Sequence, residues 1–315
     1  MKGFKQIKAG YYHPEQCNLN DFKEIIEKKL SADSVPNSSE IKKNIPIYDN
    51  GKLQHVFKNE DLKCELMAEW AWVLKEGSGA VVIRNAYSDT TFIDQATAIY
   101  EGIIADEKLK IGGGEDHFAA AGSNDRIWNS LQKLCESSPD VFFRYFANVA
   151  IQTACEAWLG PNYQMTAQVN LVHPGGVAQQ AHRDYHLGFQ TAETSSKYPT
   201  HVHELSPTLT LQGAIAHCDM PIESGPTKLL PFSQSYLPGY AAWRREEFRE
   251  VFENWYVQFE DDIANFQKEI RRLIEYSSWL KSLNCKHLII PTEQLVHLIP
   301  PVSYTHLTLP TKRIV

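Results

Sequence analysis

The chain changes character at Gly160 and Pro161, and this change constrains the fold more than any other feature of the sequence. Before it, apolar residues recur at the roughly three- to four-residue spacing of amphipathic helices, as in the stretch that begins at Asp61. After it, apolar and polar residues alternate from Met165 to Leu171, which is typical of a half-buried strand. We therefore expect helices in the first half and short strands in the second.

Glycine, proline and capping residues divide the chain further. We expect a loop at residues 31–51, a helix from Asp61, a strand at residues 79–85, a helix from Ser88, helices at 126–134 and 140–159, and further strands at 208–216 and 227–231. Helices followed by short strands predict an α+β fold. Its core would be a jelly roll, the cupin-like double-stranded β-helix, with the N-terminal helices packed on one sheet.

Composition narrows the class of protein. A chain of 315 residues with 43% hydrophobic content can bury a large core. The net charge of −7, without a run of Lys or Arg, gives no reason to expect nucleic acid or a membrane as partner. The six cysteines are far apart and form no CxxC pair, which favours a reducing compartment. Because no signal peptide or long apolar stretch is visible, we expect a cytoplasmic protein.

The sharpest local feature is the sequence QAHRDYH at residues 180–186, which contains His182 and Asp184. Alternate residues of an extended segment point the same way, so this imidazole and this carboxylate can meet at one cation. A second histidine from a distant strand would complete a 2-His-1-carboxylate site, which suits iron(II) and leaves positions open for other ligands. His182 and Asp184 are therefore candidate metal ligands and catalytic residues. An isolated His-X-Asp is more often a solvated turn.

The residues around this motif resemble the phytanoyl-CoA dioxygenase family. The resemblance runs through residues 79–85 (GAVVIRN), 116–119 (DHFA), 124–128 (NDRIW), the turn Pro174–Gly176, the His182 motif and residues 225–231. It implies an Fe(II)/2-oxoglutarate-dependent dioxygenase that consumes O₂ and 2-oxoglutarate and hydroxylates a small organic substrate. It also implies the jelly-roll fold. Neither the identity of the substrate nor the oligomeric state follows from the sequence.

Polar residues on the expected strands are candidates for binding 2-oxoglutarate. Gln212 precedes His217 on one strand, and Gln168 and Asn170 lie on the strand before the His182 motif. An exposed strand face is the competing interpretation of all three. We expect His217 and Asp219 to form structural hydrogen bonds rather than to bind metal. A second alternating pair, His201 and His203, is expected in a surface loop.

The resemblance ends at Gln258. The family places a second iron-binding His and an Arg that pairs with 2-oxoglutarate downstream, and we find neither in the family's pattern among residues that include His287, His297 and His306. Residues 302–312 resemble a translated sequencing adapter. We therefore expect a truncated or chimeric chain, divided into an N-terminal extension and loop (1–60), a dioxygenase-like jelly-roll domain (61–258) and a divergent, artefactual tail (259–315).

Two alternatives to an active dioxygenase stay open. The chain would be a catalytically inactive jelly-roll fragment or binding module if the third iron ligand is missing, and turnover by the chain as written would then be near background. A hydrolytic zinc protein that uses His182, Asp184 and either His186 or His201 is the other alternative.

Overall fold

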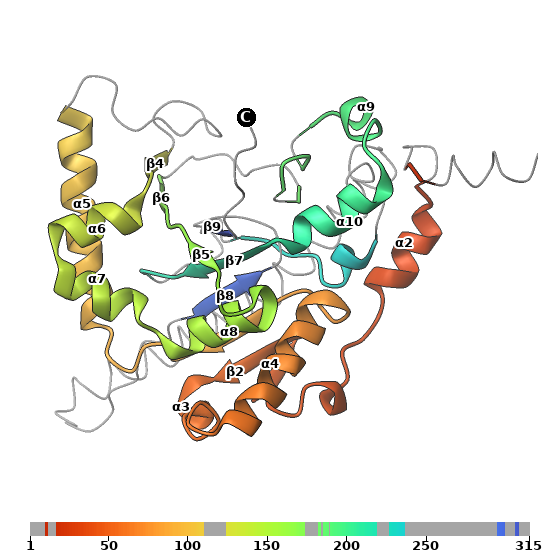
Figure 1. Ribbon diagram of the computed structural model, residues 1–315, viewed down its shortest axis with the longest axis horizontal. Helices are drawn as coiled ribbons and strands as arrows, with labels where there is room; N and C mark the ends of the chain where they lie inside the picture. Colours follow the sequence, from red (N-terminus) through yellow and green to blue (C-terminus); the bar gives the residue numbers. More distant parts are fainter. Residues whose placement is uncertain are drawn as a thin grey trace, which may run out of the picture.

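The computed structural model describes residues 10–11, 17–109, 124–173, 182–183, 185–188, 190–218, 227–236, 295–299 and 306–308. Within these residues the strands form one seven-stranded and one two-stranded sheet. The larger sheet has the spatial order β1 (Glu40–Lys42), β2 (Ile45–Asp49), β3 (Val81–Arg84), β8 (Leu295–Ile299), β7 (Thr210–Ile215), β9 (His306–Thr308) and β5 (Gln164–Met165). The smaller sheet pairs β4 (Asn124–Ile127) with β6 (Val169–Val172) (Figure 1).

Helices occupy most of the first half of the chain. They are α2 (Leu19–Ile26), α3 (Asn50–Leu53), α4 (Glu60–Lys75), α5 (Thr91–Leu109), α6 (Ser130–Ser137), α7 (Pro139–Phe146), α8 (Val149–Leu159), α9 (Ala192–Ser195) and α10 (Thr200–Thr208), with short 3-10 helices at Ala32–Ser34 and Ser233–Ser235. Asparagine caps begin several of them, because a side-chain oxygen satisfies the first free amides of a helix. Asn59 caps α4 and Asn148 caps α8 in this way.

Strand β3 lies in the middle of the larger sheet, where it pairs in parallel with β2 and antiparallel with β8. Strand β7 pairs antiparallel with both β8 and β9. The β-branched run Val81, Val82 and Ile83 is buried along its whole length, as a central strand requires. This is the strand that the sequence predicted at residues 79–85, and the prediction is confirmed.

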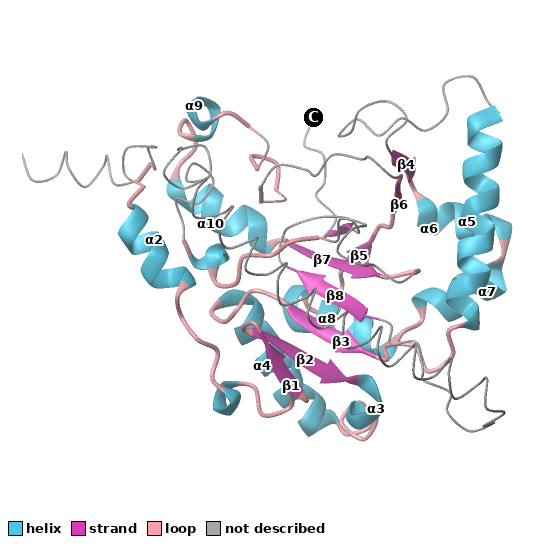
Figure 2. Cartoon of the chain, turned by 180° about the vertical axis from the view of Figure 1, so that it is seen from behind, coloured by secondary structure: helices cyan, strands magenta, loops and turns pink. Residues whose placement is uncertain are grey.

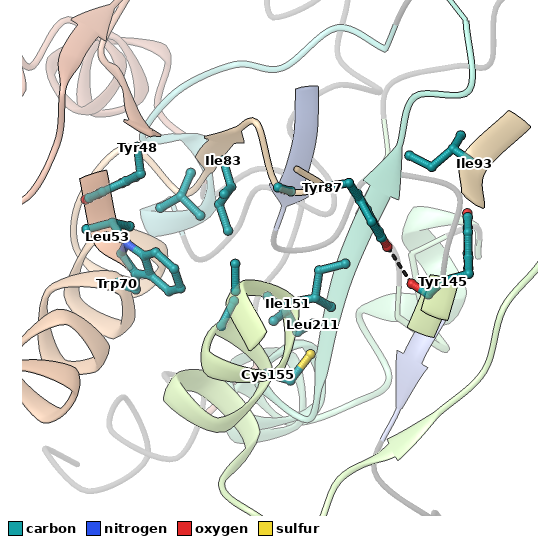
Figure 3. Packing of buried hydrophobic residues seen from close by; sticks show 14 of the residues in the cluster. Tyr48, Leu53, Trp70, Ile83, Tyr87, Ile93, Tyr145, Ile151, Cys155 and Leu211 are labelled. Atoms are coloured by element: carbon teal, nitrogen blue, oxygen red, sulfur yellow. Dashed lines mark hydrogen bonds between the residues drawn. The ribbon is translucent and has the colours of Figure 1, made fainter. Parts of the chain in front are cut away.

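Helices α4 and α8 pack against each other and cover one face of the larger sheet. They lie in front of the sheet in Figure 1 and behind it in Figure 2. Their contact with the sheet forms the main core, in which Trp70, Ile83, Ile151 and Leu211 are buried together (Figure 3). Burying each of these side chains contributes roughly 1.5–3 kcal/mol to folding. The opposite face of β2 and β3 is covered in part by Leu229.

The overall class follows the expectation in part. The structure is a mixture of helices and sheets with helices packed on one sheet, as predicted. The described sheets do not by themselves form a double-stranded β-helix, so the jelly roll stays a prediction.

Several local predictions were wrong. Residues 31–51, expected as loop, contribute β1 and β2, because the Ile45–Tyr48 stretch is buried against β3. The helix expected at 126–134 begins as β4, and the helix expected at 140–159 is broken where Asn148 starts α8. Residues 227–230 form no strand, and a 3-10 helix follows them at Ser233–Ser235.

The pair His201 and His203 lies on α10 rather than in a surface loop, and His203 is buried. Pro199, in an extended conformation, is the N-cap of this helix. No helix in the part of the chain that the structure describes is both long and apolar enough to cross a membrane. Apolar stripes at residues 240–258 and 260–283 also predict helices, but these residues lie outside the described ones.

Candidate metal and cosubstrate site

His182 is half-buried and precedes a short turn, whereas its expected partner Asp184 lies outside the described residues. The backbone N–H of Tyr185 donates to the carbonyl of Arg183 over 3.1 Å, and Gly188 N–H donates to Tyr185 O over 2.8 Å. Residues 185–188 are thus turned, directly after the segment from His182 to Asp184 for which the sequence argument expects an extended backbone. A Cβ at Gly188 would lie 1.5 Å from Arg183 O, so this turn admits only glycine there.

Two of the candidate cosubstrate residues lie beside a buried arginine. Arg126 on β4 is 4% exposed, and its Nη1 donates to Oε1 of Gln168 over 2.9 Å. Its guanidinium lies 5.2 Å from the ring centroid of Trp128. Asn170 on β6 is the Cα partner of Arg126 in the antiparallel ladder, so their side chains share one face of the two-stranded sheet. The Oδ1 of Asn170 is buried and accepts no hydrogen bond within the described part of the chain.

Arg126 is not among the site residues predicted from the sequence. Residues 124–128 carry part of the family resemblance, but a helix was expected from residue 126. Treating residues 124–127 as a strand could have identified Arg126. Side chains alternate between the two faces of a strand, and a strand that places Arg126 inward would pair with the strand that carries Asn170.

Gln212 lies on β7 in the larger sheet and is 1% exposed. Its Cα pairs with Ile299 of β8 and with His306 of β9. Strand β8 also places His297 in the ladder, opposite Ala214. Two of the downstream histidines therefore lie on strands that flank β7, although the sequence shows no family pattern around them.

His217 follows β7 and forms two side-chain hydrogen bonds. Its Nδ1 lies 2.8 Å from Thr97 Oγ1, and its Nε2 lies 2.7 Å from the hydroxyl of Tyr145. Thr97 already donates its only hydroxyl proton to Ile93 O, so Nδ1 carries the ring proton and Tyr145 donates to Nε2. Burial lowers the pKa of His217 to about 4. A structural histidine was expected here, and these bonds confirm it, whereas Asp219 lies outside the described residues.

Two histidines near the motif have other contacts, namely His186, which is a candidate of the alternative zinc site, and His203, which is not. His186 is exposed, and its Nδ1 lies 2.8 Å from Ser206 Oγ. His203 donates from Nε2 to Ser195 O over 3.0 Å, so its Nδ1 accepts from Tyr185 OH over 2.8 Å. Burial lowers the pKa of His203, which keeps the ring neutral. Both ring nitrogens of His203 are thereby occupied.

A second cluster that the sequence did not predict joins the ends of β4 and β6. Nε2 of His173 lies 2.7 Å from Oδ2 of Asp125, which also accepts from Lys108 Nζ over 2.6 Å. Burial raises the pKa of Asp125, but the hydrogen bonds from Lys108 and His173 outweigh it and hold the pKa below its usual range. These contacts fasten the smaller sheet to α5.

Residues 76–274 match the family model for phytanoyl-CoA dioxygenase (PhyH), which covers more than half of the chain. The chain belongs to the phytanoyl-CoA dioxygenase family. Comparison with curated proteins and with solved structures gave no match. Members of the family are in general Fe(II)/2-oxoglutarate-dependent oxygenases that use O₂. The matched range contains His182, Asp184, Arg126, Gln168, Asn170 and Gln212, and it ends before β8 and β9.

The donor chemistry of the motif fits the metal that the family uses. One imidazole nitrogen and one carboxylate are the ligand types of a facial iron(II) site. No group of three His, Cys, Asp or Glu side chains that could hold a metal occurs among the described residues, which exclude Asp184. Of the expected pair, the described part therefore contains His182, and Asp184 lies outside it.

Proposed function

We propose that this phytanoyl-CoA dioxygenase family member is an Fe(II)/2-oxoglutarate-dependent dioxygenase that hydroxylates a small organic substrate. The observation that carries the proposal is the family match across residues 76–274, which includes both residues of the His-X-Asp motif. His182 and Asp184 are the proposed iron ligands and catalytic residues. Iron(II), when bound, supplies the oxidising chemistry that couples decarboxylation of 2-oxoglutarate to hydroxylation.

The protein's part in this reaction is to hold and orient the reactants. His182 would offer an imidazole nitrogen and Asp184 a carboxylate oxygen, and the turn closed at Gly188 follows directly after them. Iron(II) bound by three protein ligands retains open positions for a chelating cosubstrate and O₂. A third protein ligand would have to come from a histidine downstream of the motif, and of these β8 carries His297 and β9 carries His306.

Binding of 2-oxoglutarate needs a cation for its distal carboxylate, and Arg126 is the proposed residue. Its guanidinium is buried, held by Gln168 Oε1 and stacked over Trp128, so it is oriented before a ligand arrives. Asn170, opposite Arg126, would contribute a polar side chain to the same face. Gln212, buried on β7, is the remaining cosubstrate candidate. A cationic partner for the cosubstrate is thus available within the matched range.

Anaerobic titration of the protein with iron(II) and 2-oxoglutarate tests this function. An intact site should give the weak visible metal-to-ligand charge-transfer band of an iron–2-oxoglutarate chelate. Iron(II) alone and 2-oxoglutarate alone, as controls, should give no band. A band that is absent at saturating concentrations of both would reject the proposed function.

The alternative is a jelly-roll fragment or binding module without turnover. It is favoured because the sequence downstream of the motif shows no second iron-binding His and no 2-oxoglutarate-binding Arg in the family's pattern. Succinate formation in the presence of iron(II), ascorbate, O₂ and 2-oxoglutarate separates the two. A protein that gives the charge-transfer band but only background succinate binds the cosubstrate and does not turn it over.

A further inference from the structure

We propose that Arg183 is a positioning residue for the metal ligands on either side of it, and that it acts by fastening the His182 motif to residues 232–236. The proposal rests on the proposed function, because it assigns a role toward the metal that His182 and Asp184 would bind. Arg183 is not itself a metal ligand, because its guanidinium donates to backbone carbonyls of the protein.

Two short hydrogen bonds of Arg183 come from one atom. Nη2 donates to the carbonyl of Ser233 and to the carbonyl of Tyr236, each over 2.6 Å. These carbonyls lie at the two ends of the turn that contains the 3-10 helix Ser233–Ser235. Ser233 O also accepts from Tyr236 N–H within the turn, and a charged donor such as Arg183 makes a stronger bond than a neutral one. Specific hydrogen bonds from Arg183 therefore join the His182 motif to this turn.

The turn that receives Arg183 is fastened to the core. Nε2 of Gln234 donates to Gly77 O over 2.8 Å, and Phe232 N–H donates to Ser78 O over 3.1 Å. Phe232 is 4% exposed. Gly77 and Ser78 connect α4 to β3, which is an interior strand of the larger sheet. Arg183 thus links the candidate metal ligands to one of the best-packed parts of the fold.

Tyr236 extends the same connection to the N-terminal helix. Its hydroxyl accepts from Asn18 N–H over 2.7 Å and donates to Asn18 O over 3.2 Å, and its ring packs edge-on against Phe22 with 5.2 Å between ring centroids. Tyr236 meets Arg183 only through its backbone carbonyl among the contacts described, so a change of its side chain leaves that carbonyl in place. Tyr236→Phe therefore separates the stability of this region from the hold on the motif.

The position of Arg183 explains why the contact matters for metal binding. His182 and Asp184 are its immediate neighbours, so fixing the Arg183 side chain restricts the backbone on both sides of it. A metal ligand must be placed to within a few tenths of an ångström, and residues that orient ligands typically contribute roughly 10- to 100-fold to metal affinity. Arg183 is expected to act in this range.

Titration with cobalt(II), an iron(II) substitute whose visible spectrum reports ligand geometry, tests the proposal on the full chain. Arg183→Gln should lower cobalt affinity by roughly 10- to 100-fold and change the visible spectrum. Arg183→Lys should recover most of both, because one ammonium nitrogen can also donate to two carbonyls. Tyr236→Phe should lower the melting temperature but keep the parent's affinity and spectrum. Arg144→Gln, which removes a half-exposed arginine from α7, is the matched control and should behave as the parent.

The outcomes distinguish this proposal from the proposed function. If His182→Ala loses cobalt while Arg183→Gln keeps the parent's affinity and spectrum, Arg183 does not position the ligands and the metal site stands. If His182→Ala binds cobalt as the parent does, the metal site is wrong and the role of Arg183 fails with it. Should Arg183→Gln not fold, Arg183→Met, which keeps the apolar stem, provides the same comparison. An effect of Tyr236→Phe on affinity equal to that of Arg183→Gln would show general destabilisation and contradict the proposal.

Discussion

Arg126 and Asn170 lie directly opposite each other on the antiparallel strands β4 and β6. The two residues are far apart in the sequence. Their pairing places the buried guanidinium of Arg126 and the buried amide oxygen of Asn170 on one face of the smaller sheet. Gln168 completes this arrangement by accepting a hydrogen bond from Arg126. The three residues form a polar cluster within the family match, with Arg126 buried and Gln168 and Asn170 half-buried, and we therefore propose that it binds the cosubstrate carboxylate.

Arg126→Gln should weaken 2-oxoglutarate binding. Loss of a charge-assisted hydrogen-bonded pair removes about 1.5–3 kcal/mol, which corresponds to a roughly 10- to 100-fold rise in the dissociation constant. The measurement is the dependence of the anaerobic charge-transfer band on 2-oxoglutarate concentration. Arg144→Gln controls for the loss of one positive charge. An unchanged dissociation constant in Arg126→Gln, with normal circular dichroism, would remove Arg126 from the cosubstrate site.

Tyr48→Phe should destabilise the protein without affecting metal binding. The hydroxyl of Tyr48 donates to Oε1 of Glu69 over 2.7 Å, and Asn37 donates to Oε2 of the same buried carboxylate. Burial first, and then the Glu69 charge, raises the pKa of Tyr48 far above its usual range, so the hydroxyl stays protonated as a donor. Removing this hydroxyl leaves the Glu69 carboxylate without one of its hydrogen bonds, which should lower the free energy of unfolding by about 1–3 kcal/mol.

Urea unfolding measures this cost, with Tyr198→Phe as the control. Tyr198 is 39% exposed, so its variant should lie within about 0.5 kcal/mol of the parent. Equal stability of Tyr48→Phe and Tyr198→Phe would show that the bond to Glu69 contributes nothing to folding.

The sequence predicted the elements whose pattern is strong and local. The apolar stripe that contains Leu66, Trp70 and Val73 identified α4, and the β-branched run at Val81–Arg84 identified β3. Both patterns arise because the side chains on one face of a regular element are buried. The family resemblance likewise identified His182 and Asp184 as candidates, and the match across residues 76–274 confirms the family.

Other features depended on contacts that no local pattern records. Strands β1 and β2 were expected as loop, since residues such as Pro36, Pro46 and Gly51 favour turns, yet pairing with β3 compensates for their weak propensity. The break at Asn148 was missed because apolar residues continue on both sides of it. Arg126 was missed as a site residue because its significance arises only when β4 lies against β6.

The stability of the protein should fall between about pH 6.5 and pH 4 through His217. The pKa of this ring is lowered from 6.5 to about 4, first by burial, although Asp94 opposes the shift. The unfolded chain therefore binds a proton in this interval that the folded protein does not, so the stabilisation is complete above pH 6.5 and is lost as the pH falls toward 4. By about pH 4.5 this one group should have cost about 2–3 kcal/mol.

Urea unfolding of the parent and of His217→Gln, at about pH 7 and about pH 4.5, isolates this contribution. All other titratable groups are the same in both proteins. Between about pH 7 and about pH 4.5 the parent should therefore lose about 2–3 kcal/mol more of its free energy of unfolding than the variant loses. The same loss in both would mean that His217 takes up its proton in the folded protein at an ordinary pH.

Gly188→Ala should disturb the turn after the metal motif. The added Cβ would meet the carbonyl of Arg183 at 1.5 Å, so the backbone on either side must move. Cobalt(II) affinity should fall as the ligands lose their spacing. Gly102→Ala is the matched control, because Gly102 lies within α5 with no atom within 4 Å of the added Cβ, and it should stabilise the protein by about 0.5–1 kcal/mol. Parent-like affinity in Gly188→Ala would show that the turn does not position the motif.

The central claim is that His182 and Asp184 hold iron, and metal content tests it most directly. The parent, His182→Ala and Asp184→Ala are reconstituted with iron(II) under anaerobic conditions, freed of excess metal, and analysed for bound iron beside their circular dichroism spectra. We predict that the parent retains iron while both variants lose it, with the fold unchanged because His182 is only half-buried and each substitution removes one polar side chain. Equal iron content in all three proteins would contradict the assignment and, with it, the proposed function.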